Sequence, residues 1–171
     1  MPNKYLIAIL PPEPFASEIY NLKEYFRDQY KSKASLNSPA HITLHMPFEF
    51  DNEGKLLTKF QELRVEPFTI DLKDFGCFEP RVIFIGVKKN PALESCQNQV
   101  MNFCKRELDI FNADYKDQPF HPHVTLAFRD LKRNMFQTAW SEFKSRSYNA
   151  VFECSHISLL KHDGKFWREF S

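Results

Sequence analysis

The stretch HPHVTLAF, residues 121–128, alternates polar and apolar side chains within a β-prone run. Successive side chains of a strand point to opposite faces, so His121, His123 and Thr125 share one side, and the apolar residues between them share the other. A strand that only fills a core has no need for two histidines and a threonine on one face. The polar side of this strand is therefore a candidate functional surface.

A second stretch, HITLHMPF at residues 41–48, has the same design. Both stretches contain His-x-Thr-x, with a β-branched residue at the first x and leucine at the second; the two motifs are His41-Ile42-Thr43-Leu44 and His123-Val124-Thr125-Leu126. A single motif of this kind would be unremarkable. Two of them, in matching positions of the two halves of the chain, are a specific indication of a shared functional site. By strand alternation, His45 and His121 are expected on the same faces as the motif histidines.

The residue types in the two motifs suit acid–base chemistry on a phosphate ester. Histidine titrates near neutrality, so a neutral imidazole can accept a proton while a charged partner donates one. A threonine hydroxyl can donate a hydrogen bond to a non-bridging phosphate oxygen. This design requires no metal and no cofactor. The sequence therefore predicts a phosphodiester held between the two strands, if they face one another across a groove.

The periodicity of apolar residues predicts the elements around the two motifs. Helices are expected where apolar residues recur every three or four positions, namely at about 14–31, 53–63, 91–111 and 132–144. Strands are expected at 4–10, 41–50, 68–75, 81–87 and 122–128, with one or two more within 149–160. Asp163-Gly164 is typical of a hairpin turn, here leading into KFWREF.

The resulting order is β-α-β-α-β-β-α-β-α-β-β-β, and each half offers a strand, a long helix and a strand that carries histidine and threonine. With only four glycines in the chain, no stretch is typical of a linker between independent domains. These features favour an α+β fold of two lobes with antiparallel-rich sheets over a doubly wound parallel sheet. We expect residues 1–171 to form a single two-lobed domain.

The composition excludes several classes of protein. The net charge of +1 gives no large electrostatic bias toward nucleic acid or membranes, so local groups would have to hold any polyanion. The four cysteines have no CxxC or zinc-like spacing, and no segment is typical of a signal peptide or a membrane span. We expect reduced, mostly buried thiols in a cytoplasmic monomer that needs no membrane and no obligate protein partner.

Together, the paired His-x-Thr motifs, and above all FHPHVTLAF, resemble the 2H phosphoesterase superfamily, in the branch of 2′-5′ RNA ligase-like and 2′,3′-cyclic phosphodiesterase proteins. The strands KYLIAIL and RVIFIGV extend the resemblance over nearly the whole chain. It implies a pseudo-twofold α+β fold, with two antiparallel-rich sheets flanking a central groove and helices outside. It also implies metal-independent cleavage or formation of 2′-linked phosphoesters in RNA ends or small cyclic nucleotides.

Carried over by position, the resemblance makes His41 and His123 the catalytic pair and Thr43 and Thr125 the phosphate-holding hydroxyls. One histidine would activate the attacking group and the other would protonate the departing ribose oxygen, but the sequence does not assign the two roles. The chain departs from the resemblance after HVTLA, where a basic residue is expected. Phe128 stands there, and Arg129 follows one step later, where strand alternation points it the opposite way.

Four further residues are candidates for substrate binding: Arg81, Phe78, His45 and His121. Arg81 could grip a phosphate through its planar guanidinium, and Phe78 could stack a base. Each has a purely structural alternative: Arg81 could be a solvated arginine at the end of a strand, and Phe78 could belong to the core. His45 and His121 would lie in a second layer or at the groove rim.

Two other functions stay open at this point. A nucleic-acid or nucleotide binding module would keep the groove and bind RNA ends in a salt-dependent way without turnover. A metal-dependent hydrolase could instead use His41, His45, His121 and His123 as zinc or copper ligands, and chelation would abolish its activity.

Overall fold

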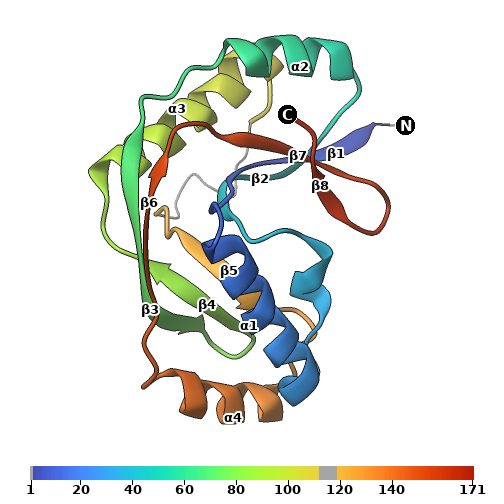
Figure 1. Ribbon diagram of the computed structural model, residues 1–171. Coiled ribbons are helices and arrows are strands. Elements are labelled where there is room, and N and C mark those ends of the chain that lie inside the picture. The colour runs from blue at the N-terminus through green and yellow to red at the C-terminus, as the bar shows by residue number, and fades with distance from the viewer. Residues whose placement is uncertain (1, 112–118) are drawn as a thin grey trace.

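The computed structural model describes residues 2–111 and 119–171, and within them it contains eight strands, four α-helices and one short 3₁₀ helix (Figure 1). Their order along the chain is the predicted one. The elements are β1 (Asn3–Ile9), α1 (Phe15–Tyr30), η1 (Ala34–Asn37), β2 (Ile42–Phe50), α2 (Glu53–Glu62), β3 (Phe68–Phe78), β4 (Val82–Val87), α3 (Pro91–Leu108), β5 (His123–Ala127), α4 (Arg133–Phe143), β6 (Asn149–Cys154), β7 (Ser158–His162) and β8 (Trp167–Glu169).

All neighbouring strands pair antiparallel, in the order β6-β3-β4-β5-β2-β1-β7-β8. The sheet consists of two four-stranded halves, and between them β5 and β2 pair at one position, Ile42 with Val124. The predicted α+β fold with antiparallel sheets is confirmed. The two sheets that the sequence predicts are continuous through this single pair, which we call the seam.

The helices pack across the seam. Helix α1 connects β1 to β2 but packs on β5, whereas α3 connects β4 to β5 but packs on β2. In Figure 1, α2 and α3 cover one end of the molecule and α1 and α4 the other. Ile42 and Val124 are fully buried beneath these helices. This reciprocal packing holds the two His-x-Thr strands side by side and gives the fold its approximate twofold symmetry.

Local signals set where the helices begin and end. Asn90 caps α3, because its side-chain oxygen accepts a hydrogen bond from the Leu93 N–H at 3.1 Å, and Pro91 occupies the first helical position. The same helix ends at Leu108, earlier than predicted, because Asp109 takes a left-handed φ of 55° that stops it. None of the described helices is long and apolar enough to cross a membrane.

Strand β3 runs further than the sequence predicts. The strand predicted at 68–75 would end before Gly76, yet Gly76 pairs with Phe84 and Phe78 pairs with Val82 in the β3–β4 hairpin. The turn therefore falls after Phe78, and β4 begins at Val82. Although β4 lies between β3 and β5, this extension brings the Phe78 ring to 5.1 Å from the ring of His123, in the second His-x-Thr motif.

Candidate active site

The seam brings the two His-x-Thr motifs together. Because β2 and β5 pair antiparallel at Ile42 and Val124, one step to either side sets His41 opposite Thr125 and Thr43 opposite His123. Directly opposed residues of a sheet share a face. The pair at the seam is buried in the core, and the four polar side chains lie on the other face, where each is half-buried. The result is a compact patch of two imidazoles and two hydroxyls, arranged with local twofold symmetry.

The two imidazoles are held in the same way. The Nδ1 atom of His41 lies 2.7 Å from the Pro39 carbonyl oxygen, and the Nδ1 atom of His123 lies 2.7 Å from the His121 carbonyl oxygen. A carbonyl oxygen can only accept, so each Nδ1 carries the hydrogen and donates it. Each Nε2 is left to accept a proton when the ring is neutral and to donate one when it is charged.

Burial sets the protonation of both rings. The pKa of His41 is lowered to about 4, chiefly by burial and to a smaller extent by the positive charges of Lys23 and His123, while the hydrogen bond to Pro39 opposes the shift. The pKa of His123 is also lowered, chiefly by burial and secondarily by the charge of His121. In the absence of an anion, both rings are therefore neutral near pH 7. An anion between them would favour their charged forms.

An aromatic wall flanks His123. The rings of Phe78 and Phe84 each lie 5.1 Å from the His123 ring, and the two phenylalanines lie 4.6 Å from one another. Phe84 pairs with Thr125 across the β4–β5 ladder, so it lies on the same face as the polar patch. The structure thus places the predicted Phe78 beside the patch and adds Phe84, which sequence reasoning missed because RVIFIGV has the composition of a buried central strand.

The wall depends on a glycine. A Cβ atom on Gly76 would lie 2.5 Å from the Phe84 ring, so Gly76→Ala must push that ring away from its place beside His123. We expect Gly76→Ala to cost about 1–3 kcal/mol of stability and to lower any catalytic activity that depends on the His123 imidazole. The matched control is Gly54→Ala, at the start of α2, where the nearest atom lies 3.8 Å away. Chemical denaturation and steady-state kinetics on both variants measure these effects, and equal behaviour of the two would contradict the expectation.

The expectation that His45 shares the face of His41 is wrong. Ile7 pairs with His45, whereas the next residue, Ala8, pairs with Thr43, so β2 contains one extra residue between these pairs. This β-bulge reverses the alternation. His45 consequently lies on the core side, 1% exposed, with its ring edge-on to Phe48 at 5.4 Å.

The other two substrate-binding candidates lie at the margin of the patch. His121 precedes β5 and is exposed; its carbonyl anchors His123, and its ring meets Phe78 edge-on at 4.9 Å. Arg81 lies in the exposed turn between β3 and β4, where its backbone N–H donates to the Phe78 carbonyl. The structure therefore gathers His121 and Phe78 around His123 and leaves Arg81 at the rim.

A cleft of about 600 Å³ opens on the other side of the patch and is lined by His41 and Thr43. Phe128 and Arg129 both line it, with the Arg129 guanidinium 5.2 Å from the Phe128 ring centre. The expectation that Arg129 points the opposite way is therefore wrong. Strand β5 ends at Ala127, so alternation no longer applies to the residues that follow.

A buried lysine fixes the loop that leads to His41. The Lys23 Nζ atom, on α1, donates to the carbonyl oxygens of Ser35 and Ser38 at 2.8 and 3.0 Å. Lys23 is 2% exposed, and burial lowers its pKa to about 8. Because the His41 imidazole bonds to Pro39 in the same loop, Lys23 helps to position that ring. No sequence pattern indicates this role, since Lys23 lies on the apolar stripe of an otherwise ordinary amphipathic helix.

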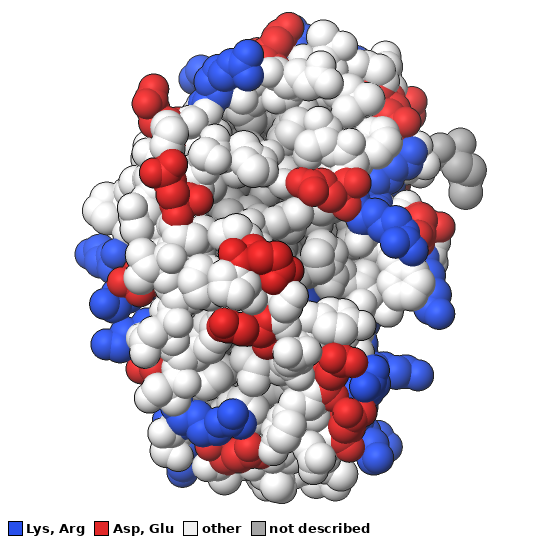
Figure 2. Space-filling view, viewed as in Figure 1, with Lys and Arg blue, Asp and Glu red and all other residues white. Residues whose placement is uncertain are grey.

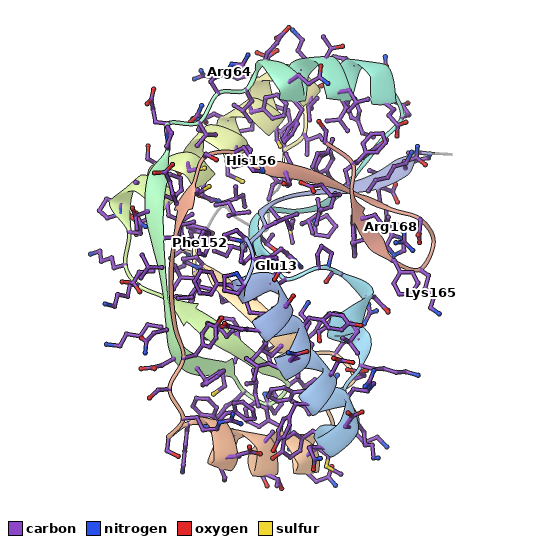
Figure 3. The ribbon with its side chains drawn as sticks, in the orientation of Figure 1. Glu13, Arg64, Phe152, His156, Lys165 and Arg168 are labelled. Carbon is purple, nitrogen blue, oxygen red and sulfur yellow. The ribbon has the colours of Figure 1, made fainter. Side chains whose placement is uncertain are left out.

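The two histidines that belong to neither motif and do not neighbour one, His162 and His156, lie in different parts of the structure. His162, at the end of β7, lines the cleft beside His41 and packs against Trp167 at 4.9 Å. His156 lies between β6 and β7, where it lines a separate pocket with Arg64; Figure 3 labels both residues. His162 reaches the site because β7 pairs with β1 near the edge of the sheet, and no local sequence pattern could have revealed this pairing.

The four-histidine metal site considered from the sequence does not form, because the bulge turns His45 to the opposite face of β2. Across residues 2–111 and 119–171, no three His, Cys, Asp or Glu side chains are grouped so that they could hold a metal ion.

Comparison with known proteins places the chain among phosphoesterases. Residues 11–166 match the family model described as the 2′-5′ RNA ligase superfamily. A Geobacillus kaustophilus protein that is provisionally named a phosphoesterase is 31% identical over 163 residues, which are 92% of this chain and 87% of that protein. An RNA 2′,3′-cyclic phosphodiesterase from Aeropyrum pernix is 31% identical over 102 residues, or 56% of each chain.

Solved structures show the same fold. LigT of Escherichia coli, crystallised with 3′-AMP, superimposes with a TM-score of 0.67 at 20% identity and covers 100% of this chain and 97% of its own. A Thermus thermophilus protein superimposes with a TM-score of 0.67 at 18% identity, over 98% of this chain and 95% of its own. At 18–20% sequence identity, these superpositions establish that the chain has the same fold as the two proteins.

Proposed function

The chain belongs to the 2′-5′ RNA ligase superfamily of 2H phosphoesterases, and from this premise we propose that it hydrolyses, or reversibly forms, 2′-linked phosphoesters at the seam. Suitable substrates are 2′,3′-cyclic phosphates and 2′-5′ linkages in RNA ends or small nucleotides. One observation carries the proposal: the pairing of Ile42 with Val124, which sets two identically anchored imidazoles and two threonines on one face.

In the proposed reaction, His41 is the base and His123 is the acid, because burial lowers the pKa of His41 to about 4 and keeps its ring neutral. The His41 Nε2 takes a proton from water as the water oxygen bonds to phosphorus. A protonated His123 gives its Nε2 proton to the ribose oxygen as the P–O bond to that oxygen breaks. Afterwards His41 is charged and His123 is neutral, and exchange of protons with solvent restores both.

The two threonines and the charged ring stabilise the developing charge. The Thr43 and Thr125 hydroxyls are placed to donate hydrogen bonds to the non-bridging oxygens of the phosphate. Such donors act most strongly where water is excluded, and the aromatic wall of Phe78 and Phe84 shields the His123 side of the patch. Every step uses side chains of this chain.

The pKa directions predict an acid-shifted pH profile. The base must be neutral, so kcat/KM rises as the pH increases through about 4, the pKa of His41. The acid must be protonated, so kcat/KM falls as the pH increases through the lowered pKa of His123. We expect a bell-shaped dependence of kcat/KM on pH, with its maximum below the ordinary histidine pKa of about 6.5. Measuring kcat/KM from pH 4 to 9 tests this, and a plateau that extends above pH 8 would contradict it.

Turnover of adenosine 2′,3′-cyclic phosphate in the presence of EDTA tests the proposed function itself. We expect hydrolysis to proceed at the rate seen without the chelator, since the proposed steps need no metal. A binding module would bind RNA ends and release them unchanged. A metal-dependent hydrolase would lose its activity in EDTA and regain it with zinc or manganese.

We further propose that the chain works as a cytoplasmic monomer. All four cysteines are free, and three of them, Cys96, Cys104 and Cys154, are buried. This supports the expectation of reduced thiols. The packing of α1 and α3 across the seam supports a single unit in which neither half of the sheet acts alone.

A further inference from the structure

Little backbone pairing holds the seam, although the proposed reaction depends on it. Strands β2 and β5 pair at one position, Ile42 with Val124, whereas β1 and β2 pair from Asn3 with Phe50 to Ile9 with Ile42. His41 precedes β2 and lies outside that ladder. Its place relative to β5 therefore depends on residues 31–40, which lead to it and which we call the approach loop.

Asp130 attaches the beginning of the approach loop to the end of β5. It lies in the turn that follows this strand. Its carboxylate accepts a hydrogen bond from the Ser32 hydroxyl at 2.7 Å and from the N–H groups of Lys33 and Ala34 at 2.9 and 3.0 Å. Hydrogen bonds to an ionised acceptor are roughly twice as strong as those between neutral groups. One side chain thus binds three successive residues of the loop.

A second attachment reaches the second His-x-Thr motif itself. The Ser35 hydroxyl donates a hydrogen bond to the carbonyl oxygen of Leu126, the last residue of that motif, at 2.6 Å. Because Ser35 is 2% exposed, water cannot readily replace this bond. The approach loop is therefore bound at two points to the segment that carries His123.

The approach loop passes this constraint on to the His41 ring. From α1, Lys23 holds the Ser38 carbonyl at 3.0 Å. That carbonyl belongs to the planar peptide bond between Ser38 and Pro39, and the proline ring fixes the φ angle of Pro39. Only the ψ angle of Pro39 separates this plane from the Pro39 carbonyl, which accepts the hydrogen of the His41 Nδ1 atom at 2.7 Å. The His41 ring consequently follows any movement of the loop.

These attachments are buried. On the face that Figure 2 shows, acidic and basic side chains are interspersed at the surface, where ion pairs contribute little to stability. Lys23, Ser32 and Ser35 are instead at most 2% exposed. Buried polar groups are costly to leave without a partner, so the hydrogen bonds of the approach loop hold it in one arrangement.

Resting on the proposed function, we propose that Ser35 and Asp130 are positioning residues, which attach the loop before His41 to the strand of His123 and so set the spacing of the two rings. Neither lines the cleft beside His41, and neither takes part in the proposed proton transfers. Their effect on the rate is nevertheless large, because a displacement of about 1 Å in a catalytic group can lower a rate by roughly 10²-fold.

Kinetics in two backgrounds test the inference. In the otherwise unchanged protein, Ser35→Ala and Asp130→Ala should each lower kcat on adenosine 2′,3′-cyclic phosphate by about tenfold or more, with KM nearly unchanged. In the His41→Ala background, the same replacements should lower the residual kcat no further, because they act through the His41 ring. A purely structural role would reduce the residual kcat by the same factor as in the first background.

Two matched controls lie away from the seam. Ser158→Ala removes a serine hydroxyl that is equally buried and donates to Glu169 at 2.7 Å, which joins β7 to β8. Glu142→Gln alters a carboxylate that joins α4 to α1 by accepting hydrogen bonds from Tyr25 and Tyr30. Both variants should keep the wild-type kcat.

Thermal melting establishes that each variant is folded. If Asp130→Ala does not fold, Asp130→Asn replaces it, since an asparagine keeps one acceptor oxygen and lacks the charge. The Asn variant should show a smaller loss of kcat with the same dependence on His41.

Two results would overturn the inference while leaving the proposed function intact. One is a wild-type kcat in either Ser35→Ala or the Asp130 variant. The other is a loss of kcat that recurs at full size in the His41→Ala background or in the two controls. Failure of the wild-type protein to hydrolyse the cyclic nucleotide would instead overturn the proposed function, and this inference with it.

Discussion

His41→Ala and His123→Ala each lower kcat on a 2′,3′-cyclic nucleotide by roughly 10²–10⁴-fold, the range typical of a lost general acid or base. Each replacement removes the Nε2 atom that is proposed to exchange a proton with the substrate, since the Nδ1 atoms are occupied by the Pro39 and His121 carbonyls. Neither ring belongs to the apolar core, so both variants should stay folded. Initial rates at saturating substrate, with thermal melting of each variant, measure the two effects.

His156→Ala is the matched control for these losses. His156 is a histidine that belongs to neither motif; it is exposed and lies between β6 and β7, beside a separate pocket. It should retain the wild-type kcat. The assignment of the catalytic pair is wrong if His41→Ala and His123→Ala both hydrolyse the cyclic nucleotide at the wild-type rate.

Phe143→Ala should destabilise the protein by about 3–5 kcal/mol, the usual loss for a phenylalanine removed from a core. The Phe143 ring is completely buried at the centre of an aromatic cluster, 4.8 Å from Phe26 and 4.9 Å from Phe75. These contacts join α4 to α1 and β3. The cavity left behind would loosen the packing that presses α1 onto β5.

Urea denaturation followed by circular dichroism measures this loss as a change in the midpoint at constant slope. Phe111→Ala is the matched control, because Phe111 is 71% exposed and should change stability by less than about 0.5 kcal/mol. Similar midpoints for the two variants would show that Phe143 does not hold the core together.

Much of the fold could be predicted because the decisive patterns are local. The alternation in HITL and HVTL sends Ile42 and Val124 to the core and leaves the polar partners on the other face, as strand geometry requires. The helix periods and the order of the elements are likewise local properties. That the two motifs meet at one seam was an inference from their resemblance to one another, and the structure shows the pairing that achieves it.

The remaining features depend on non-local pairing. The bulge that turns His45 inward exists only because β1 pairs with β2 out of simple register, through Ile7 and Ala8. The place of Arg129 in the cleft depends on where β5 ends, and that end is set by its pairing partner β4. The place of Trp167 in the cleft depends on the pairing of β8 with β7 at the edge of the sheet. No local hydrophobic periodicity and no turn signal in the sequence indicates any of these three features.

The central claim is that two imidazoles from separate strands act on one phosphorus atom in a single transition state. A double-mutant cycle on kcat for adenosine 2′,3′-cyclic phosphate, with His41→Ala, His123→Ala and the combined variant, tests it most directly. Groups that act as one unit are not additive, so the combined variant should lose little more than the worse single variant. Losses that multiply in the combined variant would show that the two histidines act independently, and the claim would fail.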